Sequence, residues 1–184
     1  MFIPRYAFFT KGKGVHRNEL ESFELALRDA GISHMNLVEV SSILPPDCKF
    51  VSREEGLAML QPGQITFCVL SRNSTPEPRR LITASVGIAK PKEHHYGYIS
   101  EHHDFGLTAE EADEFTQDMS ASMLASTLGV QFDPDADWDE RKQLFQMADF
   151  MVETFAVSSE AHGYYEKGKP AKWTTVIAAA VLVL

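Results

Sequence analysis

Nine consecutive apolar residues, 176–184, end this chain and restrict the folds that it can adopt. The run is much too short to cross a bilayer as a helix, which takes about 20 apolar residues. We therefore expect residues 173–184 to form a buried strand. With 184 residues, 44% of them apolar, the chain can bury a real core. We expect a single domain that spans residues 1–184.

Two segments carry the start and stop signals of long helices. The first begins at Asn18 and Glu21, which have the spacing of a capping box, and ends before a glycine. The second has the same spacing at Thr108 and Glu111 and also ends before a glycine. A shorter helix follows the cysteine at position 48. The expected helices cover residues 18–31, 53–60 and 108–129.

Apolar runs between turn residues predict about seven strands. Glycine and proline interrupt the pattern, so a glycine-rich turn is expected at residues 11–14 and a polar loop at 73–80. Two long helices with about seven strands fit an α+β fold, a sheet-rich sandwich covered by helices. The expected strands are residues 6–10, 34–41, 65–70, 81–89, 96–101, 150–157 and 173–184.

Charge and cysteine content limit the partners and the compartment. A net charge of −9 argues against nucleic acid or an anionic membrane as the main partner. Cys48 and Cys68 are widely separated, so we expect free thiols of a reducing compartment rather than a disulfide or a zinc pair. Pro4 and Arg5 leave no continuous apolar core of signal-peptide length at the N-terminus. A cytoplasmic protein is expected.

A pair of adjacent serines, Ser41 and Ser42, ends one of the predicted strands just before two prolines. The simplest interpretation is a polar strand end that enters a proline turn. A serine hydroxyl is a weak nucleophile and becomes reactive only with help from its surroundings, such as backbone strain or donors aimed at a developing oxyanion. The serine pair indicates a function only when it is considered together with the rest of the sequence.

Four segments resemble the pyruvoyl-dependent arginine decarboxylases in order and approximate spacing. They are Ser-Phe-Glu-Leu-Ala-Leu-Arg-Asp-Ala-Gly at 22–31, Asn-Leu-Val-Glu-Val-Ser-Ser-Ile-Leu-Pro-Pro at 36–46, Val-Gly-Ile-Ala at 86–89 and Tyr-Ile-Ser-Glu at 98–101. The similarity runs from the first strand to the helix after Thr108 and returns in the C-terminal strand.

The resemblance implies a fold, a self-processing step and an assembly. The fold is a four-layer αββα sandwich of mostly antiparallel sheets covered by helices. The chain would cleave itself between Ser41 and Ser42, giving a β chain of residues 1–41 and an α chain of residues 42–184 that opens on a pyruvoyl group made from Ser42. The family forms trimers, sometimes paired into hexamers, with active sites between neighbouring subunits.

The resemblance also assigns roles to individual residues. Asn36 matches the asparagine that supports cleavage, and an amide can donate hydrogen bonds to an oxyanion without titrating. Glu101 matches the proton donor, for which a raised pKa is needed. Glu24 lies where relatives place an acidic side chain for the substrate guanidinium. The relatives' residue is aspartate in one form, so the extra methylene changes the pocket depth. Alone, each would be an ordinary surface residue.

The implied activity is decarboxylation of L-arginine to agmatine, a polyamine precursor, and carbon dioxide. The substrate amine would form a Schiff base with the pyruvoyl group, so neither a metal nor pyridoxal phosphate is expected. Two other functions remain open at this point. One is a self-processing hydrolase that keeps Ser42 as its nucleophile, and the other is an uncleaved, non-catalytic paralogue within a mixed oligomer.

Two clusters of possible metal ligands are better explained without a metal. His94, His95, His102 and His103, with Asp104, could hold zinc or iron, but adjacent strand residues point to opposite faces, so polar hairpin ends are the simpler interpretation. Residues 132–141 carry carboxylates at alternate positions, yet the glycine and the final acid of a calcium loop are missing. We expect a solvated acidic connection there.

Overall fold

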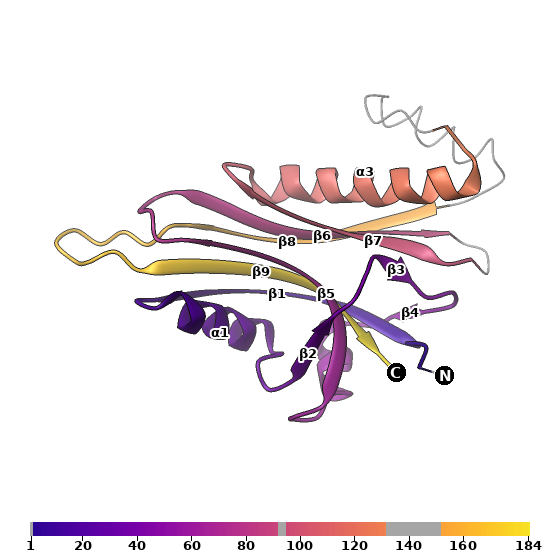
Figure 1. Cartoon of the computed structure of the whole chain (residues 1–184), viewed down its shortest axis with the longest axis horizontal. Helices are drawn as coiled ribbons and strands as arrows, with labels where there is room; N and C mark the ends of the chain where they lie inside the picture. Colours follow the sequence, from indigo (N-terminus) through magenta and orange to yellow (C-terminus); the bar gives the residue numbers. More distant parts are fainter. Residues whose placement is uncertain (1, 92–94, 132–151) are drawn as a thin grey trace.

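Helices cover both outer faces of two stacked sheets in the computed structural model, which describes residues 2–91, 95–131 and 152–184. One sheet has five strands in the order β2-β5-β9-β1-β4 and the other has four in the order β3-β7-β6-β8. Figure 1 shows α3 over the four-stranded sheet and α1 under the five-stranded sheet. The α+β sandwich of mostly antiparallel sheets is therefore confirmed.

The helices and strands have the following bounds. The helices are α1 (Glu19–Ala30), α2 (Arg53–Ala58) and α3 (Ala109–Leu128). The strands are β1 (Tyr6–His16), β2 (Asn36–Glu39), β3 (Ile43–Leu44), β4 (Lys49–Phe50), β5 (Ile65–Thr75), β6 (Leu81–Pro91), β7 (Gly97–Phe105), β8 (Val152–His162) and β9 (Trp173–Val183).

The apolar C-terminal run forms a buried strand, as expected. β9 lies between β1 and β5 and pairs antiparallel with both. Its side chains alternate between two clusters: Ile177 and Val181 pack with α1, whereas Ala178 and Leu182 pack between the sheets. A strand covered on both faces needs apolar residues at every position, which explains why this run does not alternate with polar residues.

Both long helices begin and end where the sequence predicts. The side chain of Asn18 accepts a hydrogen bond from the Glu21 N–H at the start of α1. Thr108 and Glu111 form a complete capping box at the start of α3. The glycine after each helix adopts the left-handed conformation, with φ of 82° at Gly31 and 72° at Gly129.

The glycine-rich turn predicted at residues 11–14 is wrong, because β1 continues through it to His16. The glycines instead let α1 approach the strand. A Cβ atom on Gly12 would lie 2.1 Å from the Ala26 carbonyl oxygen, and one on Gly14 would lie 2.2 Å from that of Ser22. Backbone atoms cannot yield at such distances, so these positions need glycine for packing.

The other strand boundaries differ from the prediction by a few residues. β5 continues to Thr75, which shortens the polar loop predicted at 73–80, and β7 continues to Phe105. Of the nine strands within the described residues, seven correspond to predicted ones, and the two others, β3 and β4, are only two residues long. Pairs of residues are too short to show a periodicity. The acidic connection predicted at 132–141 lies outside the residues that the structure describes.

The serine pair lies where the chain crosses from one sheet to the other. The predicted strand 34–41 is shorter in the structure: β2 ends at Glu39, on the edge of the five-stranded sheet. β3 begins at Ile43, on the edge of the four-stranded sheet. Residues 40–42 therefore connect the two layers. Among the helices in the described part of the chain, none has the length and apolar character needed to span a membrane.

Candidate active site at the sheet crossover

Hydrogen bonds fix the crossover at both of its ends. The Val40 N–H donates to the Cys68 carbonyl oxygen at 3.0 Å, which holds the chain to the five-stranded sheet. The Ile99 N–H donates to the Ser42 carbonyl oxygen at 2.7 Å, which holds it to the four-stranded sheet. Ser41 is exposed and Ser42 is partly buried. The bond between the serines is therefore both accessible and held between two anchored residues.

The chain turns tightly around Ser42. The Ile43 N–H donates to the Ser41 carbonyl oxygen at 3.0 Å, which closes a three-residue γ-turn. Ser42 is not among the residues with positive φ, so the turn is of the inverse type. A donor on the Ser41 carbonyl oxygen polarises that group and stabilises the negative charge that develops there if a nucleophile attacks its carbon.

Glu101 lies close to the serines along β7. β3 and β7 pair antiparallel with Ile43 opposite Tyr98, and the Ile99 N–H continues this pairing to Ser42. Ile99 is fully buried between the sheets. Because alternate residues of a strand share a face, Glu101 points to the same side of its sheet as Ile99. It thus lies on the inner side of β7, two residues beyond the contact with Ser42.

The surroundings of Glu101 favour its neutral form. Glu101 is exposed, but partial loss of solvation raises the pKa of its carboxyl group above the usual range. A backbone hydrogen bond opposes this shift in pKa, and the negative charge of Glu39 adds to it. Ser100, between Ile99 and Glu101, is buried and donates to the Thr116 carbonyl oxygen of α3 at 2.7 Å. That hydrogen bond fixes β7 against the helix, so the carboxyl group projects from an anchored strand.

Asn36 does not reach the serines within one protomer. It is the first residue of β2, and its side-chain amide donates to the Gly63 carbonyl oxygen at 2.7 Å. The strand from Asn36 to Glu39 alone spans about 10 Å. Within the protomer, this amide therefore supports the turn before β5 rather than the Ser41 carbonyl group.

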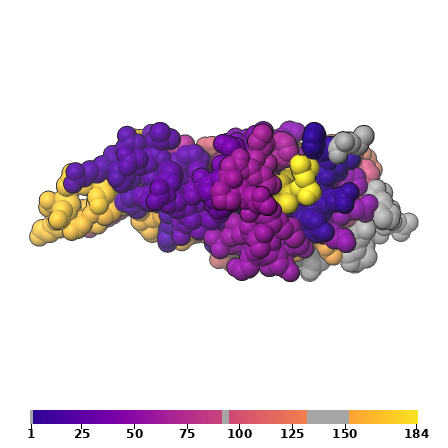
Figure 2. Space-filling model, turned by 90° about the horizontal axis from the view of Figure 1, so that it is seen from below, coloured from indigo at the N-terminus to yellow at the C-terminus, as the bar shows by residue number. Residues whose placement is uncertain are grey.

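Glu24 also lies away from the crossover. It is part of α1, the outermost layer beneath the five-stranded sheet (Figure 1), and α1 is open to solvent on that side (Figure 2). Its carboxylate accepts a hydrogen bond from Arg28 Nε at 2.6 Å. A hollow of about 460 Å³ surrounds this pair, lined by His16, Leu20, Glu21, Glu24, Leu25 and Arg28. The structure thus unites the serines with Glu101 and leaves Glu24 and Asn36 elsewhere.

Three groups at the crossover were not predicted from the sequence. Two are backbone donors, the N–H groups of Ile43 and Ile99, which any residue type except proline could supply. The third is Glu39, whose charge acts on Glu101. The pairing of β3 with β7 brings the Ile99 N–H to Ser42, and a two-residue strand gives no signal from which that pairing could be predicted. The Ile43 N–H reaches Ser41 through the turn itself, and Glu39 belongs to the other sheet.

In the described part of the chain, the histidines and cysteines form no cluster of three or more possible metal ligands. His102 contacts Asp104 at 3.7 Å and stacks against Phe115, and His94 lies outside the described residues. No cluster of three or more potential metal ligands occurs in residues 2–91, 95–131 and 152–184. Both cysteines are free and buried, as expected of unpaired thiols. Burial raises the pKa of the Cys48 thiol to about 11 and that of Cys68 to about 12, so neither is a ready nucleophile.

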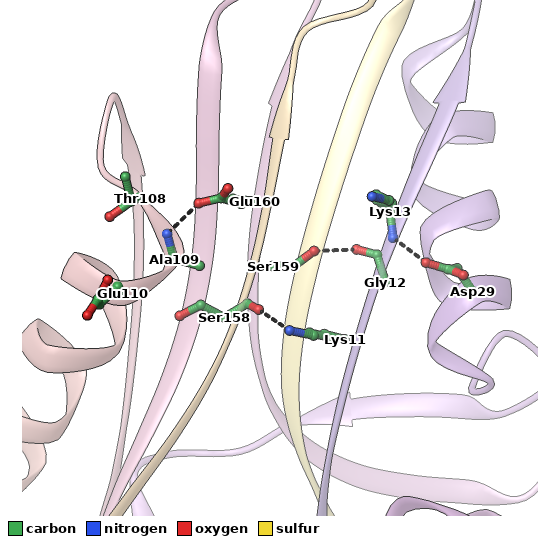
Figure 3. Close-up of a pocket in the computed structure, with 10 residues that line it drawn as sticks. All are labelled: Lys11, Gly12, Lys13, Asp29, Thr108, Ala109, Glu110, Ser158, Ser159 and Glu160. Atoms are coloured by element: carbon green, nitrogen blue, oxygen red, sulfur yellow. Dashed lines mark hydrogen bonds between the residues drawn. The ribbon is translucent and has the colours of Figure 1, made fainter.

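A second hollow, of about 490 Å³, opens between β1, β8 and the start of α3 (Figure 3). Its polar groups bond to one another. Lys11 Nζ donates to the Ser158 carbonyl oxygen at 2.9 Å, and the Ala109 N–H donates to the Glu160 carboxylate at 2.6 Å. The carboxylate thereby takes up a donor at the helix start that an anionic ligand would need. None of the predicted site residues lines this hollow.

The fold is thus a layered α+β sandwich whose two sheets are joined at a hydrogen-bonded serine pair. Residues 6–184 match the family model described as pyruvoyl-dependent arginine decarboxylase. The chain belongs to this family, and the resemblance found in the sequence is confirmed.

Similar proteins match the chain over nearly its whole length. A protein of Chlorobaculum tepidum named "Probable pyruvoyl-dependent arginine decarboxylase" is 54% identical over 183 residues, 99% of this chain and 98% of its own. A protein of Chloroherpeton thalassium with the same name is 55% identical, with the same coverage. "Pyruvoyl-dependent arginine decarboxylase 2" of Methanosarcina mazei is 54% identical over 182 residues, 98% of this chain and 97% of its own.

Proposed function

We propose that this chain decarboxylates L-arginine to agmatine and carbon dioxide, after it has cleaved itself between Ser41 and Ser42 to form a pyruvoyl group. The supporting observation is the crossover, where the carbonyl groups of both serines accept backbone hydrogen bonds in a chain of this family. The products of cleavage are a β chain of residues 1–41 and an α chain of residues 42–184, folded as one domain and located in the cytoplasm.

The bonds that cleavage makes and breaks involve only Ser41, Ser42 and water. The Ser42 Oγ attacks the Ser41 carbonyl carbon, the oxyanion forms where the Ile43 N–H already donates, and loss of the C–N bond leaves an ester. Removal of the Cα proton of Ser42 expels the Ser41 carboxylate and leaves dehydroalanine at position 42. Water then releases ammonia from that residue, so the α chain begins with a keto group.

The residues around position 42 fit that prosthetic group, because the carbonyl oxygen next to the future keto carbon already accepts the Ile99 N–H at 2.7 Å. When formed, the pyruvoyl group supplies a keto carbon for the substrate amine and an adjacent carbonyl that can accept electrons. The Ile99 N–H stabilises negative charge on that oxygen. Glu101, with its raised pKa, holds a proton and delivers it to the carbon that has lost carbon dioxide.

The active site is completed by neighbouring copies in a trimer or hexamer. Glu24, which we propose as the partner of the substrate guanidinium, belongs to α1, whereas Ser42 immediately precedes β3 at the edge of the four-stranded sheet. Figure 1 shows α1 and β3 on opposite sides of the five-stranded sheet. One arginine cannot contact both groups of a single protomer across the five-stranded sheet. Because the Asn36 amide bonds to Gly63 within its own protomer, we infer that Asn36 of one copy lies near the crossover of another, where its amide supports cleavage.

The proposed activity is tested by carbon dioxide release from labelled amino acids. Purified, self-cleaved protein is expected to release labelled carbon dioxide from arginine and to leave lysine, ornithine and histidine almost unchanged, because only a guanidinium can offer Glu24 two parallel hydrogen bonds. Equal turnover of lysine would contradict the assigned substrate. A cleaved chain that turns over none of the four would contradict the activity itself.

A mixing experiment tests the shared active site. Ser42→Ala protomers keep Glu24 but cannot form the prosthetic group, and Glu24→Ala protomers form it but lack the carboxylate. Neither variant alone should work well. Assembled together in equal amounts, they should regain about a quarter of the wild-type activity, since each site then draws its two parts independently. No gain on mixing would place both groups in one protomer and refute the shared site.

A further inference from the structure

Arg28 presents, within the chain itself, the same chemical group as the proposed substrate. Its guanidinium Nε lies 2.6 Å from Glu24 Oε1, one helical turn earlier on α1. Both side chains are partly exposed, 65% for Arg28 and 43% for Glu24, so the pair can exchange with a ligand from solution. A substrate guanidinium that binds Glu24 must therefore compete with one that is already there.

The hollow around the pair has a size and lining suited to such an exchange. Its volume of about 460 Å³ lies within the range of small-molecule sites. Leu20 contributes an apolar wall that is 71% exposed in the protomer. The other carboxylate of the lining, that of Glu21, lies 3.2 Å from His16 Nε2. With Arg28 in place, Glu24 has no uncompensated charge to offer a cation.

We propose that Arg28 sets the affinity for the substrate, because its guanidinium occupies Glu24 in the empty site and must be displaced by the guanidinium of the substrate. This inference rests on the proposed function, because it assumes that Glu24 binds the substrate. Arg28 stays covalently close to Glu24, so displacement weakens the binding of every cation. That penalty is the same for every cation, so Arg28 raises the KM for arginine. The preference for a guanidinium over an ammonium comes from the Glu24 carboxylate itself.

Replacing Arg28 by leucine in the cleaved, assembled enzyme tests whether Arg28 competes with the substrate for Glu24. Leucine preserves the helix, since its propensity is close to that of arginine. Exposed pairs of this type are weak, so we expect the KM for arginine to fall about two- to fivefold with kcat unchanged. The inhibition constant of ethylguanidinium should fall by the same factor, and the preference for arginine over lysine should stay unchanged. Ethylguanidinium binding measured by calorimetry gives the same information without turnover.

Two matched variants make the result specific. Arg5→Leu removes the same charge and size from an exposed side chain at the start of β1 and should leave the KM unchanged. In a Glu24→Gln background, Arg28→Leu should have no further effect on ethylguanidinium binding. Suppose that the KM for arginine is raised in Glu24→Gln but is unchanged or higher in Arg28→Leu. The role of Arg28 would then be refuted, while Glu24 would keep its role in substrate binding. Wild-type protein that is cleaved but inactive on arginine would overturn the proposed function instead.

Discussion

Ser42→Ala is expected to remain a single chain of 184 residues and to show no detectable arginine decarboxylation. The change removes the hydroxyl that attacks the Ser41 carbonyl carbon, and with it the only source of the prosthetic group. Ser42 is partly buried at a turn whose hydrogen bonds are all made by the backbone, so alanine should preserve the fold. Intact-mass spectrometry and carbon dioxide release measure the two effects.

Ser41→Ala is the matched control, because it changes the neighbouring hydroxyl and keeps the nucleophile. We expect it to be cleaved, with a β chain that ends in alanine. Wild-type protein should give an α chain whose terminus reacts with a ketone reagent. A free serine amine at that terminus would instead support the self-processing hydrolase, and a wild-type chain that stays whole would support the non-catalytic paralogue. Two chains in Ser42→Ala would refute the proposed cleavage chemistry.

The helices and the buried C-terminal strand could be predicted because local chemistry determines them. Capping side chains at Asn18 and Thr108 and left-handed glycines at Gly31 and Gly129 act within a few residues of the helix ends. The glycines of β1 predict a turn when the sequence is considered alone. Their actual role depends on α1, which packs against them and lies in another part of the chain. A glycine needed for close packing and one needed for a turn look the same in a sequence.

In the candidate site, too, some features follow from the local sequence and others depend on distant parts of the fold. The resemblance identified Ser42 and Glu101, but the hydrogen bond from the Ile99 N–H to Ser42 depends on the pairing of β3 with β7. No local pattern marks a backbone donor or a two-residue strand. Glu24 was recognised by its position on α1, whereas its ion pair with Arg28 follows only from the side-chain geometry. Contacts that the site residues make with other layers or other protomers cannot be predicted from the periodicity of one chain.

Glu101→Gln is expected to cleave normally and to decarboxylate arginine with a kcat lower by about 10²- to 10³-fold, the usual loss when a general acid is removed. Glutamine has nearly the same shape and accepts similar hydrogen bonds but has no acidic proton to give. Single-turnover rates of carbon dioxide release and of agmatine formation measure the effect separately on the two steps. A Glu101→Gln enzyme with unchanged kcat would remove Glu101 from the role of proton donor.

The pH dependence provides the sharper test, because its direction follows from the surroundings of Glu101. A general acid works while it is protonated, so kcat should be high below its pKa and fall as the pH rises through that value. Burial, the main cause, and the charge of Glu39 both raise the pKa of Glu101, which moves this fall in kcat to a pH above the range of an ordinary glutamate.

Glu39→Gln removes the like charge and lowers the pKa of Glu101. It should move the fall in kcat to lower pH while leaving the plateau value of kcat unchanged. In Glu101→Gln the fall should disappear. If Glu39→Gln moved the fall to higher pH, Glu101 could not be the group that titrates, whatever the effect of its own replacement.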